Sequence, residues 1–371
     1  MKIAMIGHKR IPSREGGIEI VVGELSSRMA KLGNSVTCYN RKSSHIAGKE
    51  FEAKQLDEWE GVTLKWVKTP DSSKLNAIVY STLATFKALF GGYDVIHFHA
   101  EGPSALIPLA KIFRKRCIAT IHGLDWQRSK WGGFATKFLK FGEQCAAKYA
   151  DEVIVLSRNV EKYFLDTYAR KTTYIPNGID KPTIKAADII KREYNLEKDS
   201  YILFLGRIVP EKGIHYLIDA YKQLDTDKKL VIAGGASHTS EYEAEVKQLA
   251  KGNNNIIFTG FVQGEILDEL YSNAYIYCLP SDLEGMPISL LEAMSYANCC
   301  LTSDIDECTE VCENKAEYFT KSDINSLTDK LQYLLDHQDV VKNYKNNAAQ
   351  YILDKFNWDD VTNQTLNLYK K

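Results

Sequence analysis

Short apolar runs alternate with longer segments of helical periodicity along the first half of the chain. Apolar runs of strand length are Lys2–Ile6, Ser35–Asn40, Val62–Val67, Asp94–His97, Cys117–Ile121, Glu152–Leu156 and Thr173–Ile175. Apolar residues at helical spacing occupy the segments between them: Ile18–Leu32, Leu75–Phe90, Ser104–Phe113, Phe134–Tyr149 and Asn159–Tyr168. Strands that alternate with helices of about 10–15 residues indicate βαβ units and a parallel sheet.

The pattern dissolves from Pro176 to about Ser200 and then resumes. The second series of predicted strands is Tyr201–Leu205, Lys229–Ala233, Ile256–Thr259, Tyr275–Leu279 and Cys299–Thr302. The second series of predicted helices is Ile214–Leu224, Glu241–Ala250, Glu265–Tyr271, Ile288–Tyr296 and Ile324–His337. The tail from Val340 to Lys371 is amphipathic and helical, with Trp358 as an apolar anchor.

These two series predict an α/β protein of two Rossmann-like, doubly wound domains that face each other across a cleft. We place the first domain at residues 1–176 and the second at residues 177–350. By fold analogy, a C-terminal helix at 351–371 crosses back to the first domain. Ligands of such sheets bind beyond the carboxyl ends of the strands, so we expect the site in the cleft.

Composition narrows the class of protein. The 371 residues are 44% hydrophobic and 26% charged with a net charge of −1, which is ordinary for a globular protein and gives no sign of a nucleic-acid binder. No apolar stretch approaches the roughly 18 residues of a membrane span, and the opening MKIAMIGHKR lacks the apolar core of a signal peptide. We therefore expect a cytoplasmic protein or one attached to a membrane face. The eight cysteines are expected to be reduced core residues rather than zinc ligands.

Two glycine-containing loops are candidate phosphate sites. Gly16 and Gly17 stand directly before a predicted helix, where the backbone can approach a ligand and helical N–H groups can face an anion; a flexible loop is the alternative. In FLGRIVPEKGIHYLIDAY, a strand runs into Gly206, Arg207 and Lys212. A forked guanidinium and a compact ammonium five residues apart can converge on a pyrophosphate, with a solvated charged turn as the alternative.

The segment SDLEGMPISLLEAM carries a pair of carboxylates. Glu284 lies on the loop before a predicted helix and Glu292 lies about one turn inside it. Each carboxylate can accept two hydroxyl hydrogen bonds, which suits the vicinal diols of a ribose or a hexose. The alternative is that both are acidic residues favoured by the helix dipole.

A histidine and an aspartate pair are weaker candidates. His122 ends the run CIATIHG and is either a core histidine or a site residue. Asp304 and Asp306 form a D-x-D, a motif that binds a divalent metal in some enzymes. We expect a solvated turn here, because Arg207 and Lys212 already supply positive charge. We predict no metal and no cofactor.

As a set, these motifs resemble the family 4 glycosyltransferases, which are retaining, nucleotide-sugar-dependent enzymes of the GT-B fold. The resemblance rests on Gly206–Gly213, on the Glu284/Glu292 pair, on PNGID at Pro176–Asp180 and on the Gly16–Gly17 loop. The segment His122–Glu143 resembles the bacterial subgroup that builds surface polysaccharides. The motifs span roughly residues 7 to 300, and one departure is Ala297 and Cys299 where the family usually has glycine and proline.

The resemblance implies transfer of a sugar, with retention, from a nucleotide-diphosphate sugar (UDP-sugar favoured) to a growing, lipid-linked cell-surface glycan. It implies that Arg207 and Lys212 hold the donor diphosphate with the N–H of Gly17, that Glu292 holds the ribose, and that His122 lies at the reacting face. The implied catalytic residues are His122, Arg207, Lys212 and Glu284. The implied donor-binding residues are Gly16, Gly17, Gly206, Arg207, Lys212, Glu284, Gly285, Met286, Pro287 and Glu292.

Two rival functions remain open: a GT-B enzyme of another reaction type such as a sugar-nucleotide epimerase, and a non-catalytic sugar-nucleotide-binding protein. A nicotinamide dehydrogenase is disfavoured because neither first turn carries G-x-G-x-x-G.

Residues 109–150 concentrate positive charge and aromatic side chains. They hold Lys and Arg in large excess over acids, with Trp126 and Trp131 among the aromatics. A basic, aromatic, amphipathic segment is typical of a membrane-surface element; the alternative is a helix with a solvated basic face and a buried aromatic face. We expect peripheral membrane contact through 111–148, on the inner face of the cell membrane, and no nucleic-acid partner.

Overall fold

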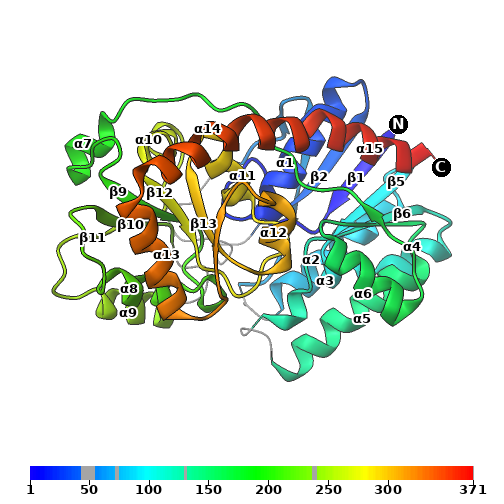
Figure 1. Cartoon of the computed structure of the whole chain (residues 1–371). Helices are drawn as coiled ribbons and strands as arrows, with labels where there is room; N and C mark the ends of the chain where they lie inside the picture. The colour runs from blue at the N-terminus through cyan, green and yellow to red at the C-terminus, as the bar shows by residue number, and fades with distance from the viewer. Residues whose placement is uncertain (43–54, 72–74, 129–131, 236–239, 371) are drawn as a thin grey trace. The chain divides into compact units, whose positions relative to one another are not determined.

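The computed structural model describes residues 1–42, 55–71, 75–128, 132–235 and 240–370. The chain divides into two compact units (Figure 1). Unit 1 comprises Met1–Gly178 together with Trp358–Lys371, and unit 2 comprises Ile179–Asn357. Both are Rossmann-like, so the predicted fold class of two doubly wound α/β domains is confirmed, and each unit is described by itself below.

Unit 1 is built on a sheet with the strand order β3-β4-β2-β1-β5-β6-β7-β8. Its strands are β1 (Lys2–Ile6), β2 (Ser35–Lys42), β3 (Glu58–Trp59), β4 (Val62–Lys68), β5 (Val95–His99), β6 (Arg116–Ile121), β7 (Glu152–Val155) and β8 (Thr173–Tyr174). Only β3 pairs antiparallel among these strands. The order reverses between β1 and β5, and such a switch point is where open α/β sheets bind ligands.

The helices of unit 1 cover both faces of this sheet. They are α1 (Gly17–Lys31), α2 (Asn76–Leu89), α3 (Glu101–Ser104), α4 (Ile107–Ile112), η2 (Asp125–Gln127), α5 (Gly133–Tyr149), α6 (Arg158–Tyr168) and α15 (Trp358–Lys370). The C-terminal α15 packs on α1 (Figure 1), and Arg28 of α1 pairs with Asp359 of α15 at 3.2 Å. One helix was predicted over Ser104–Phe113, whereas the structure has α3 and α4 there.

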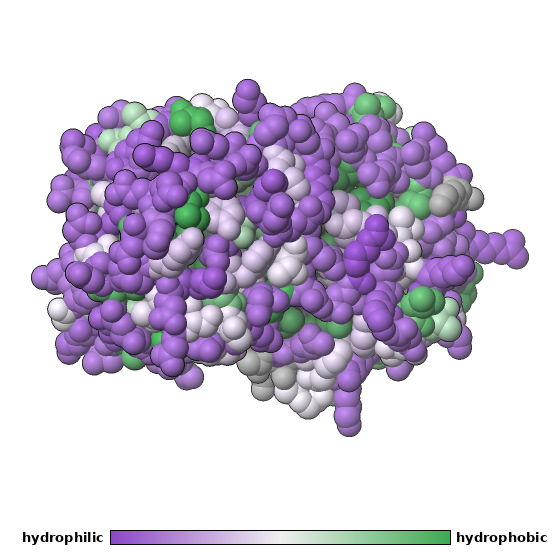
Figure 2. Space-filling view, viewed as in Figure 1, coloured by the Kyte–Doolittle hydropathy of each residue, from purple (hydrophilic) through white to green (hydrophobic). Residues whose placement is uncertain are grey.

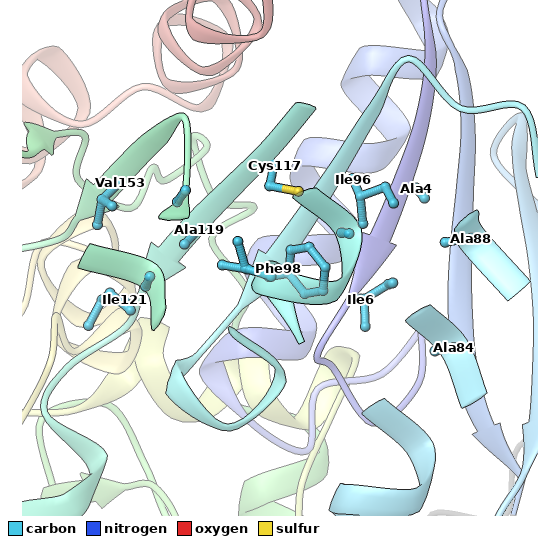
Figure 3. Packing of buried hydrophobic residues seen from close by; sticks show 14 of the residues in the cluster. Ala4, Ile6, Ala84, Ala88, Ile96, Phe98, Cys117, Ala119, Ile121 and Val153 are labelled. Atoms are coloured by element: carbon cyan, nitrogen blue, oxygen red, sulfur yellow. The ribbon is translucent and has the colours of Figure 1, made fainter. Parts of the chain in front are cut away.

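Alternate residues of β5 point to opposite faces of the sheet, as the two-residue period of a strand requires. Ile96 and Phe98 enter the apolar cluster shown in Figure 3, where they meet side chains of β1, β6 and α2. Ala84 and Ala88 of α2 also lie in this cluster (Figure 3). The histidines of β5 therefore belong to the other face.

Unit 2 has the strand order β11-β10-β9-β12-β13-β14, all parallel. The strands are β9 (Tyr201–Leu205), β10 (Lys229–Ala233), β11 (Ile256–Gly260), β12 (Ile276–Leu279), β13 (Cys299–Ser303) and β14 (Glu317–Phe319). The helices are α7 (Ile189–Tyr194), η3 (Pro210–Lys212), α8 (Ile214–Tyr221), α9 (Ser240–Leu249), α10 (Glu265–Asn273), α11 (Ile288–Ser295), α12 (Asp306–Cys312), α13 (Ile324–Asp336) and α14 (Gln338–Lys355). The switch point of this sheet lies between β9 and β12.

Three features of the chain differ from the sequence prediction. The segment before Ser200, expected to be irregular, contains α7, and the loop expected after β13 contains α12 and β14. Asp306 therefore begins a helix instead of lying in a turn, although both Asp304 and Asp306 are exposed. The tail is two helices, α14 and α15, because the chain breaks at Asn357, which forms a β-bridge with Ile179. No helix in the described part of the chain is long and apolar enough to cross a membrane.

Candidate active site

The loop after β9 is drawn against the loop after β12 by one glycine. Gly213 has a φ of +65°, and a Cβ added there would lie 2.0 Å from the carbonyl oxygen of Pro280. Only a residue without a side chain permits this approach. The exits of the two strands that flank the switch point of unit 2 are therefore in direct contact.

Lys212 and Glu284 form an ion pair across this contact. The Lys212 Nζ lies 2.5 Å from Glu284 Oε1, and the two side chains are only 12% and 9% exposed. The Ser281 hydroxyl donates to the same carboxylate oxygen at 2.6 Å. The structure thus brings together two predicted site residues that are 72 positions apart in the sequence.

The loop that carries Glu284 is fixed at Asp282. The backbone N–H of Asp282 donates to the carbonyl oxygen of Glu211 at 2.9 Å. Its carboxylate accepts hydrogen bonds from the Tyr216 hydroxyl at 3.1 Å and from the Ser322 hydroxyl at 2.7 Å. Three separate segments therefore hold this loop, so Glu284 occupies a preorganised position.

Glu292 lies on α11 and is held from α10. The Tyr271 hydroxyl donates to Glu292 Oε2 at 3.0 Å. Tyr271 stacks on Tyr296, with ring centroids 5.2 Å apart, and the Tyr296 hydroxyl donates to Asp268 at 2.6 Å. Tyr271 was not identified from the sequence, where a tyrosine in an apolar helix is indistinguishable from core.

The remaining predicted donor residues of unit 2 lie along the same edge. Gly206 and Arg207 follow β9 directly, and Arg207 is half-buried. Gly285, Met286 and Pro287 are buried, and Pro287 is the N-cap residue of α11. The edge therefore presents cations from one loop and carboxylates from the next.

In unit 1, Gly16 and Gly17 begin α1 beside a buried carboxylate. Gly16 is the N-cap residue of α1, and a Cβ there would lie 2.7 Å from Glu19 Oε2. Glu19 accepts a hydrogen bond from the Lys9 backbone N–H at 2.8 Å. Burial acts to raise the pKa of Glu19, but the charge and the N–H of Lys9 outweigh it and hold this pKa below its usual value. A negative charge therefore already lies at the start of α1.

His122 follows β6 and is half-buried. Its Nε2 lies 3.0 Å from Nδ1 of His99, the last residue of β5. Burial is the largest cause that lowers the pKa of His122 to about 4, and Arg128 adds to it against the charges of Asp125 and Glu19. The ring is accordingly a neutral imidazole at physiological pH.

The loop after His122 is held by two buried acidic side chains that sequence reasoning missed. Glu101 of α3 accepts a hydrogen bond from the Asp125 backbone N–H at 2.8 Å, and burial raises the pKa of Glu101 well above its usual value. Glu143 of α5 accepts hydrogen bonds from the Trp126 indole at 3.0 Å and from two tyrosine hydroxyls of α6. The sequence did contain one indication for Glu143, because it is an acidic residue in a segment that is otherwise mostly basic.

The outer face of α5 is both basic and aromatic. Phe134 and Phe141 are 76% and 52% exposed, and Lys137 and Lys148 lie among the exposed residues of the same helix. The alternative interpretation of a buried aromatic face is therefore wrong for these two phenylalanines. Elsewhere the surface seen in Figure 2 is mostly hydrophilic, with apolar side chains in small groups. Lys130 and Trp131, which belong to the predicted segment, lie outside the described residues.

Among the described residues, no group of three or more His, Cys, Asp or Glu side chains could hold a metal ion. The eight cysteines are all buried and free.

Two family models match successive parts of the chain. Residues 15–181 match the model "Glycosyltransferase Family 4", and residues 186–351 match the model "Glycosyl transferases group 1". Among curated relatives, the O-antigen chain mannosyltransferase C of Escherichia coli is 23% identical over 381 residues, which covers 100% of this chain and 98% of that protein.

Solved structures extend the likeness to the fold. The sucrose-phosphate synthase of Thermosynechococcus elongatus superimposes with a TM-score of 0.84 at 21% identity and covers 100% of this chain and 98% of its own. The Anabaena protein HepE, in complex with UDP and glucose, superimposes with a TM-score of 0.81 at 18% identity and covers 99% and 98%. At these identities the likeness to solved structures establishes a shared fold.

Proposed function

The chain belongs to glycosyltransferase family 4, has the GT-B fold and uses a nucleotide-sugar donor, and from this premise we propose that it transfers a sugar from a UDP-sugar to a lipid-linked glycan of the cell surface. The anomeric configuration of the sugar is retained. UDP is favoured because the Anabaena neighbour binds UDP and glucose. The surface glycan is favoured by the name of the E. coli relative.

The observation that carries the proposal is the Lys212–Glu284 ion pair at the switch point of unit 2. Lys212 and Arg207 bind the donor diphosphate, and Glu284 with the backbone of Gly285–Pro287 binds the donor sugar. When the bond between the sugar C1 and the phosphate oxygen breaks, negative charge grows on the departing diphosphate. Fixed cations aimed at that charge lower the barrier, because they need no reorganisation during the reaction.

We assign the other predicted residues roles in the same reaction. Glu292, held by Tyr271, binds the ribose hydroxyls. The N–H of Gly17 at the start of α1 contacts the diphosphate, against the repulsion of the ionised Glu19 carboxylate that lies beside Gly16. His122, a neutral imidazole, contacts the donor sugar through a hydrogen bond. The acceptor hydroxyl forms the new bond to C1 as the bond between C1 and the phosphate oxygen breaks, and its proton passes to the departing diphosphate.

Turnover with purified donors tests this function. Thermal-shift screening of nucleotide sugars comes first, because a ligand that binds only the native state raises its melting temperature. The selected donor is then incubated with and without acceptor, and release of nucleoside diphosphate is measured. Release that depends on the acceptor supports glycosyl transfer. Donor conversion without acceptor indicates an epimerase, and binding without any turnover indicates a sugar-nucleotide-binding protein.

Acceptor class is tested in the same assay. Extracted lipid-linked glycans and a soluble sugar phosphate are offered in parallel, since one structural neighbour is a sucrose-phosphate synthase. Transfer to the sugar phosphate alone would overturn the lipid-linked acceptor and leave the glycosyltransferase assignment intact.

We further propose that α5 rests on an anionic membrane surface at the inner face of the cell membrane. Each cation near such a surface contributes about 1 kcal/mol, within a Debye length of about 8–10 Å. Exposed Phe134 and Phe141 would insert between lipid headgroups. Co-sedimentation with vesicles should require anionic lipid, weaken with salt, and fall in the double variant Lys137→Glu/Phe141→Ser. The matched control is Lys247→Glu on α9, an exposed lysine of unit 2. Wild-type protein that ignores anionic vesicles at low salt would contradict this proposal.

A further inference from the structure

The last turn of the C-terminal helix reaches the buried histidines of unit 1. Tyr369 of α15 is 3% exposed, and its hydroxyl lies 2.6 Å from Nδ1 of His97. The two rings meet edge to face, with centroids 5.6 Å apart. The neighbouring carbonyl of Leu368 accepts a hydrogen bond from the Arg116 guanidinium at 2.7 Å. The end of α15 is thus fixed on strand β6 as well as on β5.

A row of imidazoles continues from this tyrosine to His122. His97 and His99 are two apart on β5, so their rings lie on one face, with centroids 4.1 Å apart. The second nitrogen of His97, Nε2, lies 2.7 Å from the Thr120 hydroxyl of β6. His99 then meets His122 through the 3.0 Å contact between Nδ1 and Nε2. Both His97 and His99 are fully buried, so neither ring can rotate without displacing its neighbours.

We propose that His99 and Tyr369 are positioning residues: His99 fixes the ring orientation and the tautomer of His122, and Tyr369 holds His97 in place beneath His99. The proposal rests on the role of His122 given under the proposed function. A neutral imidazole carries one N–H and one lone pair, so a hydrogen bond at Nε2 decides which of the two His122 presents at Nδ1. The direction of the His99–His122 bond therefore determines whether His122 can donate to, or accept from, a sugar hydroxyl.

Through this arrangement the C-terminal helix α15 takes part in positioning His122. The chain reaches Tyr369 only after it has passed through all of unit 2, yet the tyrosine hydroxyl acts on histidines of β5. The contacts from Tyr369 to His122 are a hydrogen bond, a ring stack and a second hydrogen bond. Tyr369 lies far in the sequence from the predicted site motifs, yet through these contacts it helps to position the predicted catalytic residue His122.

Two conservative variants test the proposal. His99→Phe keeps an aromatic ring against His97 and removes the nitrogen that meets His122. Tyr369→Phe removes only the hydroxyl. We expect kcat to fall by roughly 10- to 100-fold in His99→Phe, the scale of misplacing a catalytic group, and less in Tyr369→Phe, with KM for the donor within about threefold of wild type in both. Thr365→Val is the matched control, since this buried hydroxyl of α15 donates only to the carbonyl of Val361 in its own helix; it should leave kcat unchanged.

Spectroscopy and epistasis separate positioning from a general structural effect. In 15N-histidine NMR, the His122 nitrogens of wild type should report one tautomer, and His99→Phe should shift them toward a mixture. His99→Asn, which keeps a hydrogen-bonding group, should restore part of kcat. In a His122→Ala background, His99→Phe should cost nothing further, because residues that act through one another are not additive.

Several results would overturn the proposal. Wild-type kcat with unchanged His122 resonances in His99→Phe and Tyr369→Phe would do so, as would a full additional loss in the His122→Ala background. If His99→Phe does not fold, Tyr369→Phe and its His122 resonances decide. Absence of transfer by the wild-type enzyme with any donor would instead reject the proposed function, and the tautomer measurement would still judge the positioning.

Discussion

Replacing Lys212 by methionine shortens the side chain by one atom and removes its charge. Of the two contacts to Glu284 Oε1, only the one from the Ser281 hydroxyl then remains. Removing one partner of a buried ion pair costs about 3–5 kcal/mol. Both side chains keep some exposure, 12% and 9%, so we expect a cost nearer about 2–3 kcal/mol. For a unit of this size that corresponds to a fall in melting temperature of roughly 5–10 °C.

A double-mutant cycle then separates stability from catalysis. Lys212→Met and Glu284→Gln each leave one charge without its counter-charge, whereas the double variant leaves neither. Urea unfolding should therefore show the double variant to be more stable than the sum of the single losses predicts, with a coupling of about 2 kcal/mol. Transfer should behave differently: Lys212→Met should lose at least about 10²-fold, the scale of losing one preorganised contact to the leaving group, and the double variant should not regain it.

Two outcomes would refute this reasoning. Near-wild-type turnover of folded Lys212→Met would show that the lysine does not act on the donor diphosphate. Strictly additive losses in the cycle would show that the 2.5 Å contact contributes no net free energy of folding. Activity is compared below the melting temperature of the least stable variant, so that unfolding does not imitate a catalytic defect.

Three further predictions follow from other parts of the chain. Activity should survive EDTA, because Arg207 and the neighbouring lysine supply the charge that a metal would bring; complete loss that magnesium or manganese restores would contradict this. Stability should fall as the pH is lowered below about 6.5, because burial lowers the pKa of His8 to about 4 and that of His97 to about 3, so that the unfolded chain binds protons there first. Between pH 7 and pH 5 the free energy of unfolding should fall by about 2 kcal/mol for each histidine. Urea unfolding curves that coincide at the two pH values would contradict this. Gly213→Ala should destabilise unit 2 and abolish donor binding in a thermal-shift assay, whereas Gly252→Ala, with a φ of +87° but open space around it, should retain binding.

Most strands of the two sheets could be predicted from the sequence because they are short apolar runs between helical segments. β1 (Lys2–Ile6) and β9 (Tyr201–Leu205) have the predicted bounds. β3 and β14, with two and three residues, were not predicted, although the equally short β8 was. The α3–α4 break did carry a signal: Pro108 lies in the first turn of α4, where a residue without an N–H is favoured.

The candidate site was only partly accessible to the same reasoning. Its charged residues stand beside glycines and prolines, so Arg207, Lys212 and the Glu284/Glu292 pair were identifiable one loop at a time. The contact between Lys212 and Glu284 could not be predicted. It depends on β9 and β12 being neighbours in the sheet, and the order of strands in a sheet cannot be read from the sequence. The role of Tyr369 could not be predicted from the sequence for a related reason, because its hydrogen-bond partner His97 is 272 positions away.

The two units share the strand order of a doubly wound sheet, yet their switch points differ in chemistry. The carboxyl edge of unit 2 carries an ion pair whose lysine can be shared with an incoming anion. The carboxyl edge of unit 1 carries His99 and His122, whose pKa values are lowered chiefly by burial, that of His122 to about 4, so both stay neutral. The two sheets thus carry different chemistry: unit 2 has an ion pair on the loops after β9 and β12, whereas unit 1 has neutral imidazoles at the end of β5 and directly after β6.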